Sequence, residues 1–138
     1  MNIYIATSLN KASDHNRVRD TLLNGGYHLT YDWTVHGSVK ETTTARLSEV
    51  ASNEVRGVLS ADVLVVLLPG GHGTHTELGM ALGSGMPVIL HSTDPCYFEP
   101  GPSTNAFYHH ESVHHVVSPY EDLSLLLEKL NSLRCVDV

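Results

Sequence analysis

Cysteines, basic side chains and long apolar runs are all scarce in this sequence, and each scarcity excludes a class of protein. The two cysteines, Cys96 and Cys135, lack the spacing of a metal site or of a redox pair, which fits a reducing compartment. Eight Lys and Arg residues against fifteen Asp and Glu residues give a net charge of −7, and the basic residues are scattered. We therefore expect no nucleic acid polymer as a partner, because such proteins concentrate positive charge on one surface.

Signals for membrane insertion and secretion are also missing. No apolar run approaches the length of a membrane span, and residues 1–6 have neither the basic start nor the apolar length of a signal peptide. We therefore predict a cytoplasmic protein that has no membrane partner. The 138 residues, of which 41% are hydrophobic and 17% charged, suit a single domain over residues 1–138.

Histidine is abundant, and the ten residues include two adjacent pairs, His109-His110 and His114-His115. Imidazole is a common zinc ligand, but apart from Glu111 between the pairs no ligand set with recognisable spacing accompanies them. We therefore predict no metal and no other cofactor. Residues 91–112 instead form a long connection rich in Pro, Gly, Ser and aromatic residues, which is typical of a lid or a binding loop.

Apolar segments that favour strands alternate with segments of helical spacing. The expected strands are residues 3–6, 27–33, 63–68, 87–90 and 113–117. Helices are expected over residues 12–24 and 44–60, in the segment that carries Glu77, and after Ser118, which precedes a proline and a capping-box acid. The alternation predicts an α/β protein with one doubly wound, flavodoxin-like or Rossmann-like sheet of five parallel strands in the order 2-1-3-4-5.

The segment from residue 63 to residue 79 carries the clearest indication of a functional site. The apolar run 63–68 breaks into Pro69-Gly70-Gly71-His72-Gly73, and Glu77 follows shortly afterwards. Glycines allow the backbone to approach a ligand closely, and the start of the next helix presents free N–H groups. This pattern is typical of a site for an anion or a sugar.

Glu77 itself has two interpretations. Thr74 and Glu77 have the spacing of a capping box, in which each side chain caps the other residue's backbone N–H. Capping does not account for the glycines and His72 before the box, or for the small residues after it, which are Gly79, Ala81, Gly83, Ser84 and Gly85. We therefore predict a functional carboxylate, ionised near neutral pH because the amino end of a helix favours an anion.

A second carboxyl group, Glu54, interrupts the apolar stripe of the predicted helix 44–60. It lies three or four residues from Val50, Ala51 and Val58. Either Glu54 lies at the margin of the stripe and reaches water, or it points into the same crevice as Glu77. In the second case partial burial would raise its pKa, so that it could serve as an acid.

Residues 1–91 resemble the nucleoside 2-deoxyribosyltransferase family, which includes the related 2′-deoxynucleoside 5′-monophosphate N-glycosidases. The resemblance rests on three blocks: residues 3–8, Glu54 ahead of Ala61-Asp62, and residues 73–79. It implies cleavage of the N-glycosidic bond of a nucleoside or nucleotide, with transfer to another base or to water. It also implies a homodimer, or a higher homo-oligomer, in which a neighbouring subunit completes each site.

The resemblance further implies roles for three residues. Glu77 would attack the anomeric carbon, Tyr4 would position that carboxylate, and Glu54 would assist the departing base. An oxocarbenium-like transition state requires such a pair, a carboxylate on one face and a proton donor near the leaving group. Relatives have Asp in place of Glu54, and the monophosphate hydrolases have an arginine in the first loop, where this chain offers only Lys11.

The predicted strand order brings the loop after the first strand opposite the glycine loop, so Tyr4 and Ser8 should lie within reach of Glu77. Contacts to the substrate are expected from both loops and from the segment after the second strand. These predicted substrate-binding residues are Thr7, Ser8, Asp32, Trp33, His36, Gly71, His72 and Gly73.

Two other functions remain open from the sequence. Residues 69–77 are also similar to the Pro-Gly-Gly-x-Gly-Thr-x-x-Glu signature of the cytokinin-activating phosphoribohydrolases, which act on ribonucleoside 5′-monophosphates. A non-catalytic nucleotide-binding sensor on the same fold would retain the glycine loop without a positioned pair of acids.

Overall fold

The computed structural model describes residues 1–134, in which five parallel strands form one sheet in the order β2-β1-β3-β4-β5. The predicted fold class and strand order are confirmed. The strands are β1 (Asn2–Ala6), β2 (His28–Leu29), β3 (Val63–Leu67), β4 (Val88–Ser92) and β5 (Val113–Val117). The α-helices are α1 (Ala12–Asn24), α2 (Thr44–Ser60), α3 (His72–Gly83) and α4 (Ser124–Arg134).

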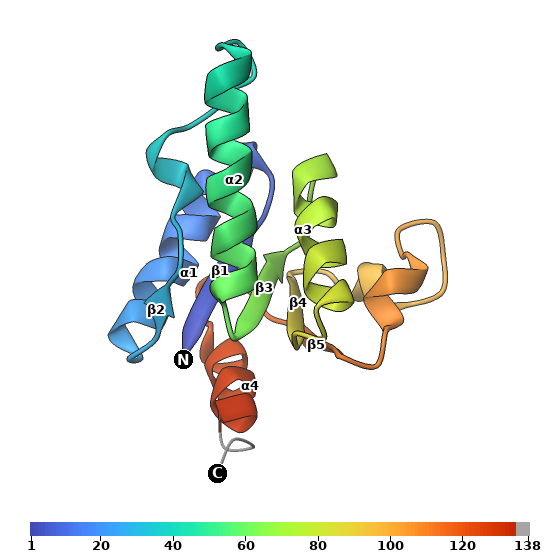
Figure 1. Ribbon diagram of the computed structural model, residues 1–138. Coiled ribbons are helices and arrows are strands. Elements are labelled where there is room, and N and C mark those ends of the chain that lie inside the picture. The colour runs from blue at the N-terminus through green and yellow to red at the C-terminus, as the bar shows by residue number, and fades with distance from the viewer. Residues whose placement is uncertain (135–138) are drawn as a thin grey trace.

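Helices cover both faces of the sheet, and each face has its own core (Figure 1). Side chains of the central strand β3 alternate between the two cores: Leu64 and Val66 pack under α2 and α3, whereas Val63 and Val65 pack against α1 and α4. Both faces are therefore apolar, which explains why β3 reads in the sequence as an unbroken apolar run.

The chain reverses its winding direction between β1 and β3, and the loops at their carboxyl ends meet there. The Thr7 hydroxyl donates to the Leu67 carbonyl at 2.7 Å, and the Ser8 hydroxyl donates to the Pro69 carbonyl at 3.4 Å. In doubly wound sheets this switch point is where ligands bind. The first turns of α2 project beyond the sheet on this side, where the strands have their carboxyl ends (Figure 1).

The second strand is much shorter than the predicted range 27–33, so that prediction is wrong beyond Leu29. The chain turns away because the Asp32 carboxylate accepts from the Thr34 N–H at 3.0 Å and caps a 3₁₀ helix, Trp33–Val35. The indole N–H of Trp33 donates to the Ile5 carbonyl at 2.8 Å, which holds this turn over β1.

The last helix begins later than predicted, because a different residue caps it. The Asp122 carboxylate accepts from the Ser124 N–H at 3.0 Å, so α4 starts at Ser124. Ser118, the predicted cap, is buried, and its carbonyl lies 2.9 Å from Nε2 of His91 at the end of β4. Ser118 therefore joins two strand ends and does not cap a helix.

The expected connection between β4 and β5 contains two 3₁₀ helices, Pro95–Phe98 and Ala106–His109. Cys96 is a free thiol in this segment, while Cys135 lies outside the described residues.

None of the helices found in residues 1–134 combines the length and the apolar character needed to span a membrane.

Candidate active site

A cavity of about 650 Å³ lies at the switch point. Its walls come from the loop after β1, the segment after β2, one side of α2, and the glycine loop with the start of α3. The lining residues are Thr7, Ser8, Leu9, Asn10, Trp33, His36, Gly37, Val39, Lys40, Leu47, Val50, Ala51, Glu54, Gly71, His72, Gly73, Thr74 and Glu77.

Most of the residues predicted for the site line this cavity. They are Thr7, Ser8, Trp33, His36, Glu54, Gly71, His72, Gly73 and Glu77. Tyr4 lies behind the wall and contacts Glu77. Asp32 is not part of the lining: its carboxylate accepts from Arg19 at 2.9 Å and lies 3.9 Å from Nε2 of His15.

Apart from Glu54, sequence reasoning missed the contribution of α2 to the wall. Leu47, Val50 and Ala51 were part of an apolar stripe attributed to the core, but all three line the cavity. Helical periodicity shows that one face is apolar, yet it does not distinguish a face that packs on the sheet from one that borders a cavity.

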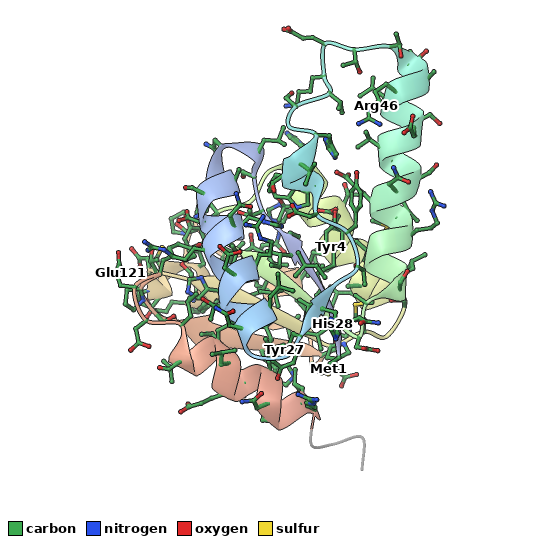
Figure 2. All side chains as sticks on the ribbon, turned by 90° about the vertical axis from the view of Figure 1, so that its left-hand side faces the viewer. Met1, Tyr4, Tyr27, His28, Arg46 and Glu121 are labelled. Atoms are coloured by element: carbon green, nitrogen blue, oxygen red, sulfur yellow. The ribbon has the colours of Figure 1, made fainter. Side chains whose placement is uncertain are left out.

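Tyr4 and Glu77 meet inside the molecule. Tyr4 is fully buried, on the side of β1 that faces α2 and α3, and its hydroxyl donates to Oε2 of Glu77. Figure 2 shows Tyr4 well inside the molecule beside α2, whereas Arg46 lies near the outer end of that helix. Gly57 of α2 makes room for the ring, because a Cβ there would lie 3.0 Å from two ring carbons of Tyr4.

The capping-box interpretation of Glu77 is wrong. Helix α3 begins three residues earlier than the box requires, with Gly71 at its N-cap. The Thr74 hydroxyl accepts from the Gly71 N–H at 3.2 Å, so Thr74 caps without help from Glu77. A Cβ on Gly70 would lie 2.4 Å from Cγ2 of Thr74, so this close approach requires glycine.

Burial dominates the ionisation of Glu77. Only 7% of the residue is exposed, and burial raises its pKa to about 8, although the hydrogen bond from Tyr4 lowers it. The expectation of a carboxylate ionised by the helix amino end is therefore wrong. Glu77 lies in the second turn of α3, and the helix effect fades within the first.

Glu54 is the second carboxyl group in the cavity. Burial raises its pKa, as expected from its place in the apolar stripe, while nearby His36 lowers it. The negative charge of Glu54 also raises the pKa of Glu77. Two carboxyl groups that influence each other in one cavity favour a state in which one carries the proton.

The histidine pairs make ordinary side-chain contacts. His109 lies 2.8 Å from the Thr104 hydroxyl, His110 lies 2.8 Å from the Ser112 hydroxyl, and Nε2 of His115 lies 2.6 Å from the Tyr108 carbonyl. Within the described part of the chain, no three His, Cys, Asp or Glu residues gather as ligands for a metal ion.

Comparisons with known proteins identify the family. Residues 3–121 match the family described as nucleoside 2-deoxyribosyltransferase, and the chain belongs to that family. The family acts on nucleosides and nucleotides by breaking or transferring N-glycosidic bonds. No curated protein sequence matches the chain.

Two solved structures share the fold. One is the CMP N-glycosidase BcmB from Clostridium botulinum, with 18% sequence identity and a TM-score of 0.58, covering 95% of this chain and 98% of that one. The other is a conserved protein from Enterococcus faecalis, with 22% identity and a TM-score of 0.57, covering 94% and 98%.

The raised pKa of Glu77 predicts a pH-dependent effect of Glu77→Gln on stability. Between pH 4.5 and about 8 the unfolded chain releases the Glu77 proton first, so ionisation costs the wild type stability as the pH rises. Gln cannot ionise and can still accept from Tyr4. We expect the variant to melt at about the wild-type temperature near pH 4, and at least about 3 °C higher at pH 8.

Thermal melting of both proteins across this pH range checks the prediction. Tyr4→Phe is the companion variant: it removes the hydrogen bond that lowers the pKa of Glu77, so the carboxyl group should titrate at a higher pH than in the wild type. A constant difference in melting temperature between wild type and Glu77→Gln would contradict a raised pKa.

Proposed function

We propose that this protein cleaves the N-glycosidic bond of a nucleoside or nucleoside 5′-monophosphate, with Glu77 as the nucleophile. The observation that carries the proposal is the pair of carboxyl groups in one cavity, with the inner one held by a buried tyrosine. Family membership supports the reaction class. Glycosidic cleavage needs such a pair, one group for the sugar and one for the leaving group.

The first step joins the sugar to the enzyme. The ionised Glu77 carboxylate attacks the anomeric carbon as the bond to the base breaks, and the Tyr4 hydroxyl keeps the carboxylate in place. With a pKa of about 8, roughly a tenth of the empty sites hold Glu77 ionised at neutral pH. In the second step water or another base attacks the same carbon and releases Glu77.

Glu54 supplies the proton that the departing base needs. A pKa raised by burial keeps more of the acid form available near neutral pH. His36 lies beside it, with Nδ1 2.8 Å from the Gly37 carbonyl, which can only accept a hydrogen bond. Nδ1 of His36 therefore carries a proton, and in the neutral ring Nε2 is an acceptor for a group on the base.

The lining of the cavity combines apolar and polar residues that suit a nucleotide. Trp33, Val39 and Val50 offer apolar surface to a flat base. Ser8 and the first residues of α3 also line the cavity, and we assign the 5′-hydroxyl or 5′-phosphate to them, because N–H groups at a helix start bind anions. Lys11, the basic residue of the first loop, already has two partners within the protein. Its ammonium donates to the Leu68 carbonyl at 3.3 Å and pairs with Asp14 at 3.5 Å.

Glu77→Gln should abolish turnover and leave binding intact. We expect the rate of base release to fall at least about 1000-fold, because an amide cannot form the glycosyl ester. Chromatography of deoxynucleosides, ribonucleosides and their 5′-monophosphates, with and without a second free base, measures release and separates transfer from hydrolysis.

Glu49→Gln is the matched control for this variant. Glu49 is an exposed carboxyl group on α2, paired with Arg46 at 2.8 Å, and its loss should leave the rate unchanged. If wild type and Glu77→Gln bind a nucleotide equally well and neither releases base, the protein is a sensor and the proposal is wrong.

Glu54→Gln should discriminate between leaving groups. Unmodified purine nucleosides need a proton to depart, so we expect their rate to fall about 100-fold or more. A purine nucleoside methylated at N7 already carries a positive charge and should be affected far less. The wild-type kcat/KM should also fall at alkaline pH as Glu54 loses its proton, and this decline should be absent in the variant. Equal losses on both substrates would mean that Glu54 only binds or orients.

We also propose that the protein is a cytosolic homodimer that pairs through α2. The exposed apolar side chains of α2, Leu47, Val55 and Leu59, lie on one ridge at spacings of eight and four residues, and Leu59 is 55% exposed.

Leu59→Glu should therefore convert a dimer to a monomer in sedimentation velocity. Leu125→Glu on α4, where the leucine is 49% exposed, is the matched control and should leave the assembly unchanged.

A further inference from the structure

His75 lies on α3, two residues before Glu77, and does not line the cavity. It lines a second depression, together with Gly70, Gly71, His72 and Thr76. Its ring is hydrogen-bonded at both nitrogens: Nδ1 is 2.8 Å from the Gly71 carbonyl, and Nε2 is 2.7 Å from the Tyr108 hydroxyl. Neither the contact with Gly71 nor the contact with Tyr108 takes part in the proposed cleavage reaction.

The chemistry of the partners determines the direction of both bonds. The Gly71 carbonyl can only accept, so Nδ1 carries a proton and donates it. In the neutral ring Nε2 then has a lone pair and accepts from the Tyr108 hydroxyl. The imidazole therefore connects the glycine loop to the segment between β4 and β5.

Tyr108, the partner of Nε2, is itself held in place by burial and by contacts with its neighbours. It is 5% exposed and packs in the core under α2 and α3. Its own carbonyl accepts from Nε2 of His115 on β5 at 2.6 Å, and its ring stacks on His75 with centroids 5.8 Å apart. A continuous line of contacts thus runs from β5 through Tyr108 and His75 to Gly71.

The Gly71 carbonyl is in turn part of the peptide that ends at the His72 nitrogen. It accepts from the backbone N–H of His75 at 3.2 Å as well as from the imidazole, so it points along α3. In a trans peptide the C=O and the N–H point in opposite directions. The His72 N–H therefore points out of the helix start, and His72 itself lines both the cavity and the neighbouring depression.

We propose that His75 is a positioning residue, which holds the Gly71–His72 peptide so that its N–H faces the 5′ end of the substrate. This inference rests on the proposed function, because it assumes that a nucleoside or its 5′-monophosphate occupies the cavity. His75 acts on binding of the substrate and takes no part in the chemical step. Loss of its bond to Gly71 should raise KM and leave kcat unchanged.

Two substitutions of His75 separate its two bonds. In His75→Asn the amide nitrogen replaces Nδ1, so the donor to Gly71 is kept and the contact with Tyr108 is lost. In His75→Gln the amide reaches the position of Nε2, so the contact with Tyr108 is kept and the donor to Gly71 is lost. We expect His75→Gln to raise KM for the nucleoside 5′-monophosphate about 3- to 10-fold, and His75→Asn to stay within about 2-fold of wild type.

Steady-state kinetics of the full chain, with thermal melting of each variant, measure these effects. Unchanged kcat in His75→Gln and recovery of KM in His75→Asn would support the proposal, since a merely structural role would affect both variants and both constants. An equal KM in the two variants, or a loss confined to kcat, would overturn it. Melting temperatures that fall equally while KM differs would still support it.

Binding without turnover distinguishes this inference from the proposed function. Calorimetric titration of a nucleoside 5′-monophosphate into Glu77→Gln, with and without His75→Gln, measures affinity alone. A 3- to 10-fold weaker dissociation constant would support the positioning role even if no base were ever released. Unchanged affinity in an active enzyme overturns only the role of His75, and no affinity for any nucleotide overturns both proposals.

Discussion

The hydrogen bond from the Tyr4 hydroxyl to the Glu77 carboxyl group is the contact on which the arrangement of the site depends. It joins β1 to α3 over the switch point, between residues 73 positions apart in the chain. A buried carboxyl group without a partner is costly, so the surrounding structure must accommodate the donor. Gly57 does so by leaving room for the tyrosine ring under α2.

The environment of each carboxyl group is consistent with the role that we propose for it. Glu77 is almost fully buried and is held by one strong donor, which suits a group that must attack in one direction. Glu54 lies half-buried on α2, with His36 nearby, which suits a group that exchanges protons with a leaving base. One cavity thus offers two carboxyl groups in different environments, because burial and neighbours differ between them.

Several histidines take structural positions around this site. His115 and His75 link β5 to the glycine loop, and His91 joins the ends of β4 and β5 through Ser118. His15 packs against Trp33 with ring centroids 4.9 Å apart, behind the wall of the cavity. These histidines suit such bridges because an imidazole ring offers a donor and an acceptor on a rigid frame.

Hydrophobic periodicity and the placement of glycines determined the order of elements, the parallel sheet and the site between β1 and β3, because these signals act locally along the chain. Tertiary structure decided what depends on competition between distant groups. The N-cap of α3 is Gly71 and not Thr74, and α4 begins at Ser124, beyond the predicted cap Ser118. Packing, and not the position of Glu77 in its helix, determined its raised pKa, since burial exists only once β1, α2 and α3 have come together.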